Sequence, residues 1–97
     1  MISKTMYKTP EGKEIHIIVD HTKNIIQNIE ITGIEFQPDD ALKKIEKELS
    51  GLDIDERTIK EKLAGIIRKH KITILGTTEY SLARAVIIAC GIIGPVI

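Results

Sequence analysis

Hydrophobic and polar residues alternate along the first part of the chain, which is the pattern of strands with one buried face. The alternation predicts three strands, over residues 2–9, 13–20 and 25–32. Short connections at 10–12 and 21–24, rich in turn-forming and polar residues, separate them. Strands joined in this way pair with their neighbours along the chain, so we expect an antiparallel meander.

From Ala41 onward the apolar residues recur at helical spacing. This spacing predicts three helices, over about 38–50, about 54–70 and from about 79 to Gly91. Between the last two lies the stretch 72–75, in which three of four residues are apolar. Its length is too short for periodicity to decide between a strand and an extended connector, so both alternatives stay open.

The ends of the predicted helices carry recognisable residues. Pro38 suits a first helical turn, because the backbone N–H that proline lacks has no helical partner there. Asp53 and Glu56 have the spacing of a capping box at the start of the second helix. Thr77 or Thr78 is expected to cap the third helix. The helix starts are therefore expected near these residues.

A three-stranded sheet needs a cover for its apolar face, and the helices that follow provide one. We therefore predict an α+β fold in which the helices pack on one face of the meander. A chain of 97 residues has room for a single domain, expected to span 1–97. The last residues, 92–97, form an uncharged apolar tail that is expected either to fold back onto the core or to meet another chain.

The composition excludes several classes of function. Basic and acidic residues number 14 each, whereas a nucleic-acid-binding module has a basic excess, so no nucleic-acid partner is expected. The longest apolar run, 85–97, is shorter than a membrane-spanning helix, so no membrane partner is expected either. A lone cysteine fits a cytoplasmic setting. The abundance of Ile, Lys and Glu is typical of thermophiles, or of an AT-rich genome.

No catalytic constellation stands out in the sequence. Cys90 lies on an apolar helix face without a cationic neighbour, which indicates packing rather than a nucleophile. His16, Asp20 and His21 are the only cluster of metal-ligand types, and on a strand His21 points away from the other two. We therefore expect no catalytic residue, no metal site and no cofactor bound by this chain alone.

Three lysines surround the first predicted hairpin, namely Lys4, Lys8 and Lys13. Lysines on an edge strand commonly protect it from pairing with other chains. The alternative is a small positive surface for an anionic ligand or an acidic partner. Both interpretations stay open at the level of sequence.

Three stretches resemble motifs of one known family. Residues 7–13, Tyr-Lys-Thr-Pro-Glu-Gly-Lys, resemble a Lys-x-Pro-Gly-Gly-Lys hairpin. Residues 29–38 resemble an Ile-x-Gly-Asp-Phe-Phe-x-x-Pro corner, and residues 45–51 resemble a Leu-Glu-x-x-Leu-x-Gly helix end. In this order they are similar to the accessory domain of lipoate–protein ligase, which is the C-terminal domain of many such ligases and a separate small subunit in some archaea. The chain departs from the motifs at Glu11, Ile34 and Glu35.

This resemblance implies a non-catalytic accessory subunit. A larger catalytic subunit would hold lipoate and ATP, form lipoyl-adenylate, and pass the lipoyl group to a lysine of a carrier domain. The accessory chain would be needed for the activation step. The residues expected to contact the partner or its ligand are Lys4, Lys8, Lys13, Gly33 and Phe36.

Two other functions fit parts of the sequence. The first is a self-associating interaction module that forms a homo-oligomer through the tail 92–97. The second is an iron–sulfur scaffold of similar build, which the lone Cys90 disfavours because a cluster needs several cysteine ligands.

Overall fold

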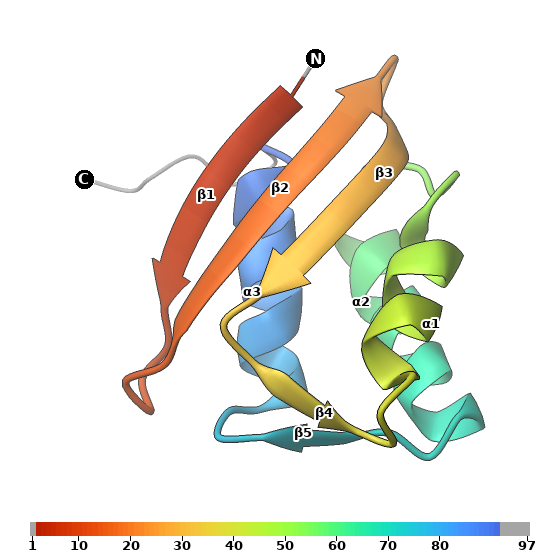
Figure 1. Cartoon of the computed structure of the whole chain (residues 1–97). Helices are drawn as coiled ribbons and strands as arrows, with labels where there is room; N and C mark the ends of the chain where they lie inside the picture. The colour runs from red at the N-terminus through yellow and green to blue at the C-terminus, as the bar shows by residue number, and fades with distance from the viewer. Residues whose placement is uncertain (1, 92–97) are drawn as a thin grey trace.

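The computed structural model describes residues 2–91 and contains a three-stranded antiparallel sheet covered on one face by three helices (Figure 1). The predicted α+β fold is thereby confirmed. The strands of this sheet lie in the order β1-β2-β3, and α3 contacts β1 and β2 while α1 contacts β3. The main elements are β1 (Ile2–Lys8), β2 (Glu14–Thr22), β3 (Ile25–Thr32), α1 (Ala41–Leu49), α2 (Glu56–Lys69) and α3 (Glu79–Ala89).

The alternation of the sequence determines which face of the sheet is covered. In β2, Ile15, Ile17 and Val19 are fully buried under the helices. The register places Ile17 opposite Ile31 of β3, which is buried as well. The outer face carries the other half of each strand, including the exposed side chain of Met6. One sheet face therefore forms the core, and the helices leave the opposite face uncovered.

The stretch 72–75, which the sequence left open between a strand and a connector, contains a strand of a second, smaller sheet. β5 (Thr73–Leu75) pairs antiparallel with β4 (Glu35–Gln37), and Phe36 stands opposite Ile74. Figure 1 shows that β4 and β5 lie at the same end of the main sheet as the β1–β2 turn. The sequence analysis did not predict β4, because three residues have no measurable period and the pairing partner lies far along the chain.

Two predicted helix starts are wrong. α1 begins at Ala41 rather than near residue 38, because the preceding residues form a turn in which the Pro38 carbonyl accepts a hydrogen bond from the Ala41 N–H at 2.9 Å. The second helix is capped by Asp55 rather than Asp53, since the backbone of Asp53 forms a bridge with Ile25. Thr78 caps α3, as predicted.

The helices contribute the remainder of the core, which includes Ile45, Leu63, Leu82 and Val86. No helix within residues 2–91 is long and apolar enough to span a bilayer. The predicted apolar tail, 92–97, lies outside the described residues.

Candidate functional site

The five residues predicted to contact a partner or its ligand divide between two surfaces. Lys13, Gly33 and Phe36 belong to the end of the molecule where the β1–β2 turn, the corner after β3 and the small sheet meet (Figure 1). Lys4 and Lys8 stand on the outer face of β1. We use the name "hairpin end" for residues 9–14, 33 and 76–78.

Gly33 is the residue at which β3 turns away from the main sheet. Its φ is +97°, a conformation that L side chains rarely adopt. A Cβ atom at this position would overlap the carbonyl oxygen of Glu14 at the start of β2. The corner therefore requires glycine for two reasons, the backbone angle and the close approach of two backbone segments.

A second glycine receives the side chain of Lys13. Gly76 precedes α3 with a φ of +84°, and a Cβ atom there would overlap Cε of Lys13. The aliphatic part of Lys13 thus lies against Gly76. Lys13 itself is exposed, and no ion pair is recorded for its ammonium group within residues 2–91. The structure therefore holds one free cation at the hairpin end, as far as the described residues extend.

Glu11 ties the β1–β2 turn to the start of α3. The hydroxyl of Thr77 donates a hydrogen bond to Glu11 Oε1 at 2.8 Å. The Ser81 hydroxyl donates to the same oxygen at 3.5 Å, and Thr78 Oγ1 accepts from the Ser81 N–H as the helix cap. The carboxylate thus stands at the positive end of the α3 dipole. The turn and the helix start are held together by a contact that the sequence analysis missed.

The electrostatics of Glu11 follow from this placement. The hydrogen bond from Thr77 lowers the pKa of the Glu11 carboxyl below its ordinary value of 4.5. The carboxylate is therefore ionised at neutral pH and occupies the helix start, where an external anion would otherwise be favoured. The only signal in the sequence was that Glu11 replaces a glycine of the similar hairpin motif. Nothing in that signal named Thr77 as its partner.

Phe36 has a mainly structural place. Its half-buried side chain packs against the core from β4. It lies three residues beyond the Gly33 corner. Its side chain therefore supports the hairpin end from the core rather than being exposed on its surface.

Lys4 and Lys8 belong to a different surface, the uncovered face of the sheet. Lys4 stands opposite Ile18, and Lys8 opposite Glu14. A shallow hollow of about 290 Å³ lies on this face, lined by Lys4, Thr5, Met6, His16, Ile17 and Ile18. Neither lysine is recorded in an ion pair with any other residue between 2 and 91.

The residues considered for metal binding do not converge. His21 is hydrogen-bonded through Nε2 to Ser3 Oγ at 3.1 Å, whereas His16 lies near Glu14 on the outer face. In the part of the chain that the structure describes, no three histidine, cysteine or acidic side chains are placed to hold a metal ion. Burial raises the pKa of the Cys90 thiol to about 11, which keeps it protonated at neutral pH.

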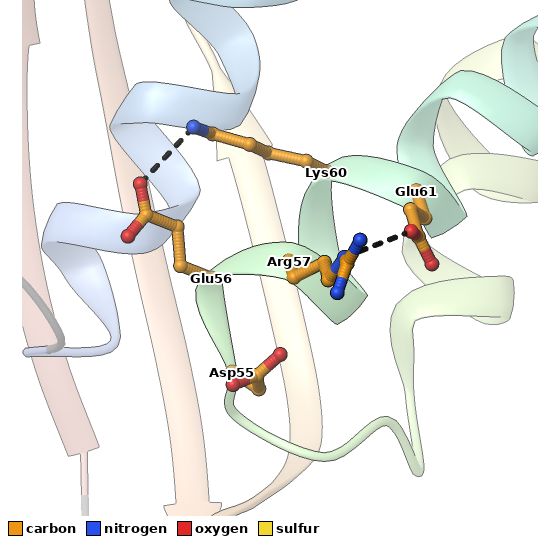
Figure 2. A pocket seen from close by; sticks show the side chains of 5 residues that line it. All are labelled: Asp55, Glu56, Arg57, Lys60 and Glu61. Carbon is orange, nitrogen blue, oxygen red and sulfur yellow. Dashed lines mark ion pairs between the residues drawn. The ribbon is translucent and has the colours of Figure 1, made fainter.

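A depression beside the start of α2 involves charges that already have partners (Figure 2). Lys60 pairs with Glu56 at 3.0 Å, and Arg57 with Glu61 at 3.4 Å. Asp55 accepts a hydrogen bond from the Thr58 N–H as the cap of the helix. These are local contacts along one helix, and they stabilise α2 rather than leave groups free for a ligand.

Comparison with known protein families finds a match to this chain. The model of the family described as "Bacterial lipoate protein ligase C-terminus" matches residues 7–94. The matched range includes the whole hairpin end and all three helices. A comparison with curated proteins finds no match.

Among solved structures, a similar chain comes from a study of an archaeal lipoylation system, a bipartite lipoate protein ligase and its E2 lipoyl domain from Thermoplasma acidophilum. The two chains are 21% identical, with a TM-score of 0.77. The alignment covers 88% of the present chain and 93% of the other. At this identity the likeness establishes a shared fold.

Proposed function

This chain belongs to the lipoate–protein ligase C-terminus family, and from that premise we propose that it is the accessory subunit of a two-chain lipoate–protein ligase. It acts with a larger catalytic chain in the ATP-dependent activation of lipoate to lipoyl-adenylate. The larger chain then transfers the lipoyl group to a lysine of a carrier domain. Lipoate and ATP bind in the larger chain, and the present chain contributes surface rather than a nucleophile.

The observation that carries this proposal is the family match across residues 7–94. The fold it shares with a chain from a bipartite ligase study supports the two-chain arrangement, because the likeness extends over 93% of that chain. The protonated state of Cys90, the one thiol of the sequence, is consistent with a supporting role.

The hairpin end is the surface we assign to the activation step. Lys13 is an exposed cation held against Gly76, and Gly33 fixes the adjoining corner against Glu14. Such a rigid surface closes over a reactive acyl-adenylate, excludes water from it and orders the loops around it. Lysine at its rim complements the negative charge of an adenylate phosphate.

The proposal is tested by mixing the purified chain with the larger ligase chain, lipoate and ATP, and measuring release of pyrophosphate. Adenylate formation is expected only when both chains are present. Lys13→Ala is expected to lower the rate, whereas Lys43→Ala, at an exposed position of α1, leaves it unchanged. Full adenylation by the larger chain alone would contradict the proposal.

A further inference from the structure

The two edges of the main sheet differ in how their backbone groups are satisfied. At the β3 edge, the Ile31 N–H donates to Glu46 Oε2 at 2.8 Å, and the Ile26 N–H donates to the Leu52 carbonyl at 2.9 Å. The Gly51 N–H returns a bond to the Ile26 carbonyl at 2.6 Å. The segment after α1 and one glutamate thus close this edge.

The β1 edge has no such cover within residues 2–91. The Thr9 N–H donates to the Lys13 carbonyl at 2.8 Å. This bond identifies which residues of β1 direct their backbone groups toward β2. Because antiparallel pairs alternate, the backbone groups of Thr5 and Tyr7 face β2, and those of Lys4, Met6 and Lys8 face outward. No backbone hydrogen bond from any described residue reaches these outward groups.

The same three residues place their side chains on the uncovered face of the sheet. Met6 is 55% exposed and stands between Lys4 and Lys8, which are exposed as well. The hollow beside Met6 lies on the same face and is lined by residues of β1 and β2. The edge therefore offers backbone donors and acceptors, the exposed apolar side chain of Met6, and two lysines that form no ion pair with any described residue, although Lys8 faces Glu14 across the ladder.

We propose that the β1 edge binds an extended segment of the larger ligase chain as a fourth strand of the sheet. Acidic side chains of that segment stand near Lys4 and Lys8, and an apolar one packs against the exposed side chain of Met6. This inference rests on the proposed function, since it assigns a surface for the partner named there. It adds a second contact surface, separate from the hairpin end.

The charges favour this occupant over a second copy of the chain. Antiparallel pairing of two β1 strands centred on Met6 sets Lys4 opposite Lys8 of the second copy. Pairing centred on Lys4 sets two copies of Lys4 opposite one another, and like charges directly opposite destabilise a strand pair. Pairing centred on Thr5 sets Lys4 opposite Met6, which leaves the lysines without an anion. An acidic segment avoids all three arrangements.

The test is amide hydrogen exchange measured by NMR on the full-length ¹⁵N-labelled chain, free and saturated with unlabelled larger ligase chain. In the free chain, the amides of Thr5 and Tyr7 are expected to exchange slowly and those of Lys4, Met6 and Lys8 rapidly. In the complex, amide exchange at Lys4, Met6 and Lys8 is expected to slow by about a hundredfold or more, because each of these amides gains a hydrogen bond that opens rarely. Thr5 and Tyr7 serve as internal references.

A charge-reversal pair gives an independent readout. The variant K4E/K8E is expected to weaken binding of the larger chain by about tenfold or more. The matched control K43E/K47E makes the same change of charge at two exposed positions of α1 and is expected to leave binding within about twofold. Equal effects of the two variants would overturn the inference.

The remaining outcomes separate this inference from the proposed function. Outward amides that stay fast in a complex that forms adenylate overturn the inference and leave the function standing. If the larger chain neither binds the present chain nor is stimulated by it, both the inference and the proposed function are wrong. Slow exchange of the outward amides in the free chain would also overturn the inference. If that protection is lost on dilution, a second copy of the chain occupies the edge. If it is lost on removal of residues 92–97, the chain's own tail occupies it.

Discussion

Gly33 and the carbonyl oxygen of Glu14 lie so close that any side chain at position 33 would overlap that oxygen. Gly33→Ala is expected to lower the free energy of unfolding by about 3 kcal/mol, through backbone strain at positive φ and displacement of a backbone segment. The matched control is Gly51→Ala, where φ is +86° and the space is open, with an expected loss of about 1 kcal/mol. Urea unfolding measures both, and equal losses would contradict the close-approach argument.

A second prediction concerns the hydrogen bond from the Ile31 N–H to Glu46. Glu46→Ala is expected to destabilise the protein by about 2 kcal/mol, because it leaves the Ile31 N–H at the sheet edge without its charged acceptor. Helix propensity works in the opposite direction, since alanine is the better helix former. Glu46→Gln retains an acceptor oxygen and should cost under about 1 kcal/mol. Thermal unfolding measures the stability of the two variants. A Glu46→Ala protein more stable than the parent would contradict a stabilising bond between Glu46 and the Ile31 N–H.

Periodicity predicted the main architecture because the buried positions in this chain repeat with the period of their element. Ile15, Ile17 and Val19 alternate along β2, and Ile59 and Leu63 recur one helical turn apart in α2. The face of each element that reaches the core could therefore be predicted before any tertiary contact was known. The fold class followed from the order of the elements.

Contacts between distant segments could not be predicted in the same way. The period of α1 places Glu46 beside the apolar face and gives no indication that its carboxylate reaches the Ile31 N–H. The spacing that suggested Asp53 as a cap was overridden by its bridge to Ile25. At the candidate site, Lys13 and Gly33 were predicted from a motif, whereas the partner of Glu11 depends on where α3 begins in space.

The state of association of the isolated chain is a third prediction. We expect a monomer in gel filtration, both with and without residues 92–97, because the surface we assign to binding accepts a different chain. The neutral charge balance gives weak long-range repulsion, so self-association would be observed readily if the tail drove it. An oligomer that dissociates on removal of the tail would favour the self-associating module instead.

The fourth prediction is a pH dependence centred on Glu48, which joins α1 to α2. His70 contacts its carboxylate, and Lys62 and Lys69 each lie 3.7 Å from it. The hydrogen bond from His70, followed by these charges, lowers the pKa of Glu48 below 4.5. A lowered folded-state pKa stabilises the protein above the unfolded pKa, and this contribution is lost as the pH falls through the folded value.

The variant Glu48→Gln therefore has a defined pH signature. It is expected to be less stable than the parent by about 1 kcal/mol near neutral pH, and the difference is expected to shrink as the pH falls through the lowered folded-state pKa of Glu48. The control Glu61→Gln alters an exposed ion pair with Arg57 within α2 and should change stability by under about 0.5 kcal/mol. Denaturant midpoints from pH 3 to 7 measure both, and a pH-independent difference for Glu48→Gln would contradict the ionic explanation.

The last prediction tests whether the bond between Glu11 and Thr77 organises the hairpin end for activation. Glu11→Ala and Thr77→Val remove opposite ends of one hydrogen bond, so each should slow adenylate formation in the mixed enzyme by a similar factor, about three- to tenfold. The double variant should be no slower than either single one, because residues that act through a shared contact are not additive. Thr22→Val, at the exposed end of β2, is the matched control and should leave the rate unchanged. Circular dichroism confirms folding of each variant.

If the effects of Glu11→Ala and Thr77→Val on the rate multiply in the double variant, the two residues act separately. Unchanged rates in all variants would place the hairpin end outside the activation step.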